Sequence, residues 1–238
     1  MSDIVLKLES VEAGYGDVQV LWDLSLEVRA GKLTTVVGAN GAGKTTTLRA
    51  ISGLLRPTHG RLMFKGEDVT RLPANKKTER GLVLVPEGRQ LFGDMTVLEN
   101  LEMGAYSKRA RQRQGRNFDR VCGYFPRIRE RLNQKAGTLS GGEQQMVALG
   151  RGLMAEPSLL MIDEMSLGLS PVLAQQLFLT LKELRNDDIT LLLVEQNVHL
   201  ALALADYAYV LAEGRVNLEG PAQEIANKDE IRKAYLGL

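Results

Sequence analysis

A glycine-rich loop at residues 38–45 has the residue types and spacing that bind phosphate. Its sequence, GANGAGKT, fits the pattern G-x-x-x-x-G-K-[ST]. Glycines let backbone N–H groups approach phosphate oxygens, and a helix that begins after the loop directs the positive end of its dipole there. We expect the Lys44 ammonium to reach the β- and γ-phosphates of a nucleotide and the Thr45 hydroxyl to ligate Mg²⁺. A chance match in a chain of 238 residues has a probability of about 1%. The expected nucleotide-binding residues of this loop are Gly38, Ala39, Asn40, Gly41, Ala42, Gly43, Lys44, Thr45 and Thr46.

Two carboxylates, Asp163 and Glu164, follow four apolar residues at 159–162. A buried parallel strand delivers such a pair to its carboxyl end, where ligands of open α/β sheets bind. Asp163 is suited to holding hydrated Mg²⁺, and Glu164 is suited to orienting or deprotonating an attacking water. An acidic pair alone is more often a solvated turn, but the phosphate-binding loop elsewhere in the chain favours the catalytic interpretation.

A second glycine-containing segment, LSGGEQQ at residues 139–145, precedes a stretch with helical patterning. Ser140 and Glu143 have the spacing of a capping box, which is the purely structural interpretation. Two glycines in the first turn of a helix cost roughly 1 kcal/mol each relative to alanine, so capping alone does not explain them. Glycines here expose N–H groups at the positive end of a helix, and a serine hydroxyl adds a donor. The segment therefore predicts an anion site.

The elements that must position these residues alternate between strand and helix over most of the chain. Residues 4–15 and 18–28 resemble a β-hairpin around Gly16-Asp17. Residues 88–155 are mainly helical, with a capping box at 96–99. Alternation resumes afterwards, with strands expected at 158–163, at 189–194 and within 207–220, and a helix from Pro171. This pattern predicts an α/β fold with a mostly parallel, covered sheet and an antiparallel β region at the N-terminus.

Composition narrows the class of protein. The hydrophobic fraction of 44% is ordinary for a globular chain, and a formal net charge of +1 provides no field to attract nucleic acid. The single cysteine, Cys122, excludes an internal disulfide framework. The most apolar run, at 200–212, is too short to span a membrane, so a peripheral association through partner subunits is the expectation.

The order of GANGAGKTT, LSGGEQQ and LLMIDE resembles that of the ATP-binding subunits of ABC transporters, and the resemblance covers essentially the whole chain. It implies one domain over 1–238 with a P-loop NTPase (RecA-like) core at 1–87 and 156–238, and a helical signature subdomain at 88–155. It also implies a head-to-tail dimer, in which ATP lies between the P-loop (38–45) of one subunit and the signature segment (139–145) of the other. Ser140, Gly141, Gly142 and Glu143 would bind that nucleotide. Tyr15 matches the aromatic position that stacks on adenine; a surface tyrosine of a hairpin is the alternative.

Three positions depart from the commonest ABC pattern. Glu87 replaces a glutamine that contacts Mg²⁺ and water, Gln196 replaces a histidine that contacts the γ-phosphate, and Met165 replaces a proline. The first two departures, within VPEGR and VEQN, resemble the ATPase subunit of branched-chain amino acid importers, as do TVLENLEMGAY and SLGLSP. By this resemblance the catalytic residues are Glu164, Gln196 and Glu87. The Mg²⁺ site is formed by Thr45, Asp163 and Glu87.

The resemblance implies an ATPase at the cytoplasmic face of the plasma membrane that drives uptake of branched-chain or related amino acids. Its expected cofactors are ATP and Mg²⁺. Its expected partners are a second ATPase subunit, identical or related, integral permease subunits and, indirectly, a solute-binding protein, with no role for nucleic acid. Other cargoes, such as urea or an exported lipid, stay open, although VPEGR and VEQN argue against lipid export. A nucleic-acid-linked ABC ATPase and a non-hydrolysing nucleotide switch are the alternatives outside transport.

A basic stretch at 107–116 is not explained by any of these motifs. Its five cations fit a solvated helical arm, or a surface that contacts phospholipid head groups or an acidic loop of a membrane subunit. They are Lys108, Arg109, Arg111, Arg113 and Arg116.

Overall fold

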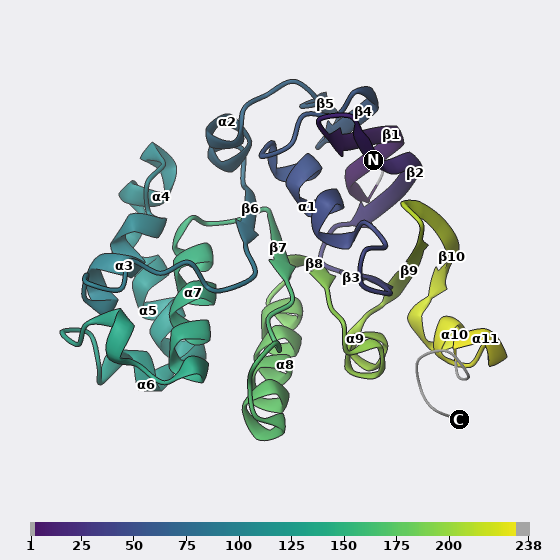
Figure 1. Cartoon of the computed structure of the whole chain (residues 1–238). Coiled ribbons are helices and arrows are strands. Elements are labelled where there is room, and N and C mark those ends of the chain that lie inside the picture. The colour runs from purple at the N-terminus through teal and green to yellow at the C-terminus, as the bar shows by residue number, and fades with distance from the viewer. Residues whose placement is uncertain (1–2, 232–238) are drawn as a thin grey trace.

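Two β-sheets and a group of helices beside them make up the molecule in this computed structural model, which describes residues 3–231 (Figure 1). The strands are β1 (Ile4–Tyr15), β2 (Val18–Arg29), β3 (Leu33–Gly38), β4 (His59–Phe64), β5 (Glu67–Asp68), β6 (Leu82–Val85), β7 (Leu159–Asp163), β8 (Thr190–Val194), β9 (Tyr207–Ala212) and β10 (Arg215–Pro221). The helices are α1 (Lys44–Ser52), α2 (Ala74–Glu79), α3 (Val97–Gly104), α4 (Lys108–Gln112), α5 (Gln114–Tyr124), α6 (Pro126–Arg129), α7 (Gly141–Met154), α8 (Pro171–Asn186), α9 (Val198–Leu204), α10 (Ala222–Ala226) and α11 (Asp229–Ile231), with a 3₁₀ turn, η1, at Ala136–Thr138.

The smaller sheet is antiparallel and contains the strands in the order β2-β1-β4-β5. Its β1–β2 hairpin turns at Gly16-Asp17, and Gly16 has a φ of 57° that favours glycine. This sheet confirms the antiparallel β region predicted at the N-terminus.

The larger sheet has the order β10-β9-β3-β8-β7-β6, and all of its pairings are parallel except that of β10 with β9. Its central strands β3, β7 and β8 are buried at every residue. Side chains that alternate along β7 belong to different cores. Leu159 and Met161 pack with α1 and the smaller sheet, whereas Leu160 and Ile162 pack with α7, α8 and α9. Both faces are therefore covered, as a parallel sheet requires, and the predicted α/β fold is confirmed.

The helices α3 to α7 lie between β6 and β7 in the sequence and form the group at the left of Figure 1. Two of them begin with the capping boxes expected from the sequence. Thr96 caps α3 with Glu99, and Ser140 caps α7 with Glu143, with side chain and backbone bonded reciprocally in both. The capping box stabilises the first turn of α7, and the helix packs against α3 and α5.

The described residues, 3–231, contain no helix long and apolar enough to cross a membrane.

Candidate functional site

The carboxyl ends of four neighbouring parallel strands meet at one edge of the larger sheet. The register pairs Val85 with Ile162 and Asp163 with Val194, and Val36 also pairs with Val194. As a result the loops after β3, β6, β7 and β8 converge. These loops carry, in that order, the P-loop, Glu87, the pair Asp163-Glu164 and Gln196. This is the edge at which open α/β sheets bind ligands.

The P-loop closes on itself around Lys44. The Lys44 ammonium is 4% exposed and donates to the carbonyl oxygens of Gly38 (3.1 Å) and Ala39 (3.2 Å). Helix α1 begins at Lys44, and Gly43 before it has a φ of 102°. A Cβ atom at Gly43 would lie 2.8 Å from Leu21 Cδ2, and one at Gly38 would lie 2.4 Å from the Leu211 carbonyl oxygen. Both glycines are therefore required by backbone geometry and close packing, and the loop presents the positive end of α1.

The acidic pair after β7 faces the P-loop residues. The Thr45 hydroxyl donates to Asp163 Oδ1 at 3.2 Å, and Glu164 Oε1 lies 3.7 Å from Lys44 Nζ. The sequence did not predict this ion pair. Glu164 adopts a left-handed conformation with a φ of 44°, and its N–H donates to the Val194 carbonyl, which ties the ends of β7 and β8 together. Such strain in a non-glycine residue is common at functional sites.

A cavity of about 570 Å³ lies between these loops. It brings together half of the site residues predicted from the sequence, because these follow the converging strand ends. Val20 and Leu167, which sequence reasoning did not single out, also contribute to its walls. The lining residues are Val20, Asn40, Gly41, Gly43, Lys44, Thr45, Thr46, Glu87, Glu164, Leu167 and Gln196.

Asp163 and Tyr15 line a neighbouring cleft of about 760 Å³ that shares Thr45 and Glu87 with this cavity. The Tyr15 side chain is 43% exposed, and its hydroxyl accepts a hydrogen bond from Arg49 at 3.0 Å. The same guanidinium lies 5.9 Å from the Tyr15 ring centroid, a cation–π contact. Arg49 is therefore the residue that orients this tyrosine, and no motif in the sequence signalled it.

The signature residues 140–143 do not line either hollow. The Glu143 carboxylate accepts from the Ser140 N–H (3.0 Å) and hydroxyl (2.7 Å), so it serves as the cap of α7. The two glycines also have a packing reason. A Cβ atom at Gly142 would lie 2.7 Å from Leu173, and one at Gly141 would lie 3.1 Å from the Arg89 guanidinium. Within one chain, the positive end of α7 and the P-loop belong to separate surfaces.

A buried glutamate next to Gln196 was not predicted. Glu195 has no exposed surface, and its carboxylate accepts from the Ser166 N–H (3.0 Å) and hydroxyl (2.7 Å). Burial raises the pKa of Glu195, while the Ser166 hydrogen bonds oppose that rise. Glu195 thus fixes the loop that follows Glu164. Met165, in the same loop, is buried in the hydrophobic core.

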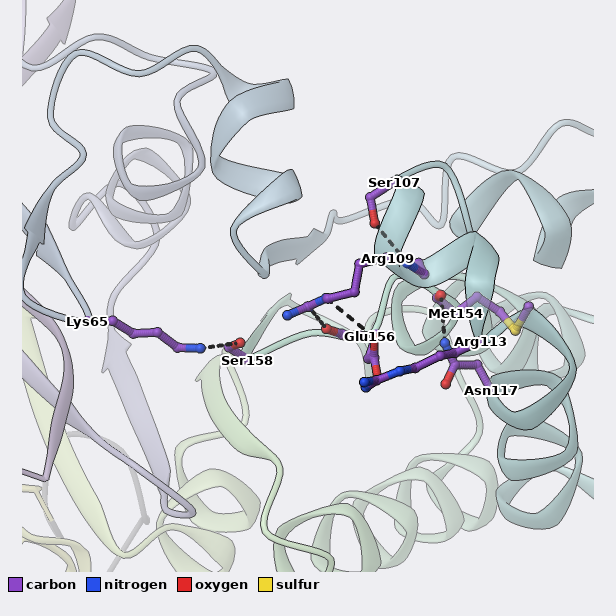
Figure 2. Close-up of polar contacts among 9 residues, drawn as sticks. Lys65, Ser107, Arg109, Arg113, Asn117, Met154, Glu156 and Ser158 are labelled. Carbon is purple, nitrogen blue, oxygen red and sulfur yellow. Dashed lines mark hydrogen bonds and ion pairs between the residues drawn. The ribbon is translucent and has the colours of Figure 1, made fainter.

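Two arginines of the basic stretch are bound within the chain rather than left free in solvent (Figure 2). Glu156, in the loop between α7 and β7, pairs with Arg113 Nη1 at 2.6 Å and with Arg109 Nε at 3.3 Å. Arg109 also donates to the Glu156 carbonyl, and Asn117 donates to the Met154 carbonyl at 3.4 Å. These contacts hold α4 and α5 against the carboxyl end of α7, where cations are favourable. The remaining cations of the stretch, Lys108, Arg111 and Arg116, are exposed, as are the paired Arg109 and Arg113.

The buried Asp163 predicts a pH-dependent stability. Burial raises its pKa from 3.8 to about 6, and the carboxylates of Glu164 and Glu87 act in the same direction. Folding therefore favours the protonated form, so the stabilisation present at low pH is lost as the pH rises through about 6. In urea unfolding with EDTA and without nucleotide, the free energy of unfolding of the wild type should fall between pH 4.5 and pH 8. Relative to that of Asp163→Asn, the fall should be on the order of 2 kcal/mol. The exposed Asp94→Asn is the control and should follow the wild type. A pH profile for Asp163→Asn parallel to that of the wild type would contradict the raised pKa of Asp163.

Comparison with known proteins agrees with this geometry. The family model described as "ABC transporter" matches residues 21–166. BraG of Pseudomonas aeruginosa, a "high-affinity branched-chain amino acid transport ATP-binding protein", is 43% identical over 98% of this chain and 100% of its own length. The ADP conformation of MJ1267, an ATP-binding cassette of an ABC transporter, has a TM-score of 0.86 and 27% identity over 99% of each chain. The dimeric MJ0796, a bacterial ABC transporter cassette, has a TM-score of 0.76 and 26% identity over 91% of this chain and 98% of its own.

The chain belongs to the ABC transporter family. It is an ABC-type ATPase, which binds and hydrolyses nucleotide, and this confirms the family and the enzyme class predicted from its motifs.

Proposed function

We propose that this chain is the ATPase subunit of an importer for branched-chain or related hydrophobic amino acids. The observation that carries the proposal is the similarity to BraG over the full length of both chains. The sequence adds VPEGR and VEQN, with Glu87 and Gln196 at positions where most ABC proteins differ. Import requires integral permease subunits, so the chain would act at the cytoplasmic face of the membrane. A solute-binding protein would deliver the cargo.

Each residue in and beside the cavity would have a distinct role in ATP hydrolysis. The P-loop amides and Lys44 would bind the phosphates, and Tyr15 would stack on the adenine. Glu164 would orient and deprotonate the attacking water, since it lies at the same wall of the cavity as Lys44. Gln196 would donate a hydrogen bond from its side-chain amide to the terminal phosphate. Unlike a histidine, it cannot carry a positive charge there. Phosphoryl transfer needs such positioning and charge stabilisation more than covalent chemistry.

The residues around Thr45 fit a magnesium ion. Thr45 and Asp163 offer oxygen ligands within 3.2 Å of each other, and Glu87 adds a third oxygen donor beside them. Mg²⁺ prefers such hard oxygen donors and keeps several of its waters. A bound ion would supply positive charge that offsets the negative charge of the phosphates. Burial is the main cause of the raised pKa of Asp163, and the carboxylates of Glu164 and Glu87 raise it further, so a bound cation would favour the ionised carboxylate.

The separation of the signature segment from the P-loop within one chain supports pairing of two subunits. Ser140, Gly141 and Gly142 would bind the ATP that the P-loop of the other subunit holds, and Glu143 would support them by capping α7. ATP would then close the pair, because both subunits neutralise its charge, and hydrolysis would remove the terminal phosphate contacts.

Uptake by the reconstituted importer tests the cargo. The chain would be co-expressed with its permease and solute-binding subunits, and the complex placed in proteoliposomes with ATP inside. We expect ATP-dependent uptake of labelled leucine, and no uptake when Glu164→Gln replaces the wild type. Competition by excess isoleucine and valine but not by urea is expected; uptake of urea without leucine would contradict the cargo while leaving the ATPase intact.

A further inference from the structure

The segment that follows Glu87 has an unusual backbone. Gly88, Arg89 and Gln90 adopt φ values of 75°, 65° and 44°, so three successive residues are left-handed. Only the first of them is a glycine, and side chains disfavour this region because Cβ crowds the following carbonyl. A strained run of this kind persists only where surrounding contacts hold it.

Arg151 on α7 supplies those contacts. Its guanidinium donates to the Gln90 carbonyl at 2.9 Å and to the Arg89 carbonyl at 3.0 Å. It also lies 5.7 Å from the ring centroid of Phe92. The planar fork of an arginine suits two adjacent acceptors. Arg151 therefore holds the left-handed residues in a fixed place along α7.

The consequence is a fixed position for the Arg89 side chain. Arg89 Nη1 donates to Gln144 Oε1 at 3.1 Å, and Arg89 Nη2 lies 3.1 Å from where a Cβ of Gly141 would stand. Gln144 and Arg151 are seven residues apart on α7 and so share a face of that helix. The half-buried guanidinium thus lies flat against the first residue of the signature helix.

This placement is electrostatically unfavourable unless an anion is present. The amino end of α7 carries the positive end of the helix dipole, which repels a cation. The one acidic side chain in the first turn, Glu143, is bound by Ser140 and by Arg131 at 2.7 Å. Among residues 3–231, none of the ion pairs with a carboxylate includes Arg89. The Arg89 guanidinium and the positive end of α7 therefore lie together, and the carboxylate in that first turn, Glu143, is already bound by Ser140 and Arg131.

We propose that Arg89 is a phosphate-binding residue of the signature segment, acting beside Ser140 and Gly141 on the ATP held by the P-loop of the other subunit. The inference rests on the proposed pairing of two subunits. A terminal phosphate is the anion that suits the site, because a guanidinium binds phosphate oxygens through two parallel hydrogen bonds. Arg89 also follows Glu87 by two residues. The same short segment would then serve the chain's own nucleotide through Glu87 and the partner's nucleotide through Arg89.

Sedimentation equilibrium of the Glu164→Gln chain with MgATP tests this inference. Arg89→Met in that background is expected to raise the dimer dissociation constant about tenfold or more, the usual effect of losing a charged hydrogen-bond donor. Arg89→Lys keeps the charge and is expected to recover part of the loss. Binding of a fluorescent ATP analogue to the dilute single chain should change less than twofold, since the P-loop is intact.

Arg111→Met, on the exposed surface of α4, is the matched control and should leave pairing unchanged. Should Arg89→Met lower the melting temperature, Arg89→Gln takes its place and must show the same loss. Equal dimer dissociation constants with and without the Arg89 guanidinium would overturn this inference but leave the proposed pairing of two subunits intact. Failure of the Glu164→Gln parent to pair in MgATP would contradict the proposed pairing, and this inference with it.

Discussion

Glu164→Gln is expected to retain ATP binding but to hydrolyse ATP roughly 10² to 10⁴-fold more slowly than the wild type, the range for loss of a positioned general base. The expectation follows from the position of the Glu164 carboxylate in the P-loop cavity, 3.7 Å from Lys44. The amide that replaces it has nearly the same shape, so the left-handed backbone at 164 and its bond to Val194 should persist. Phosphate release under saturating MgATP measures the effect.

A second left-handed glutamate provides a matched control. Glu213 has a φ of 49° and is exposed at the turn between β9 and β10, outside the cavity. Glu213→Gln should leave turnover within twofold of the wild type. Near-wild-type hydrolysis by Glu164→Gln would remove Glu164 from the role of base and would favour a water activated by other groups.

Lys44→Ala is expected to impair binding and turnover together. Removal of the ammonium deprives the phosphates of a charged donor that a neutral methyl group cannot replace, and a loss of about 10²-fold in nucleotide affinity follows from the usual strength of such contacts. The substitution also leaves Glu164 without its ion-pair partner in the P-loop cavity. Displacement of a fluorescent ATP analogue, with Mg²⁺ present, measures the affinity.

The control for Lys44 is Lys182→Ala, on the exposed face of α8. That variant should bind the analogue as the wild type does. Undiminished affinity in Lys44→Ala would show that the loop at 38–45 is not the phosphate site, whatever its sequence.

The features that sequence alone predicted are those that depend on local spacing. The hairpin at Gly16-Asp17 and the caps at Thr96 and Ser140 each follow from residues within a few positions of one another. The convergence of strand ends was also predictable, because parallel strands must place their following loops at one edge.

The features that sequence missed are side-chain contacts between distant segments. Glu156 binds Arg109 and Arg113 across more than forty positions, and Glu195 binds Ser166 across twenty-nine. A charge run in a sequence shows cations but not the carboxylate that the fold brings to them. For that reason the basic stretch had two open interpretations, and the structure shows that part of it stabilises the carboxyl end of α7.

Glycines at 141 and 142 illustrate a subtler limit. The sequence interpretation took their cost in a helix as a sign of an anion site. In the structure each also makes room for a neighbour, Arg89 or Leu173. Close packing and the proposed anion binding would both require glycine, so the sequence alone cannot separate the two reasons. The Arg89 guanidinium lies beside Gly141, so the side chain that needs space at this glycine is also the one proposed to bind phosphate.

The central claim is that a P-loop from one subunit and a signature segment from another enclose a single ATP. The mass and nucleotide content of the Glu164→Gln chain, measured together by sedimentation in MgATP, test it most directly. We predict a particle of two chains that retains two ATP molecules and dissociates when Mg²⁺ is removed. A single chain that holds its ATP at every protein concentration would contradict the claim.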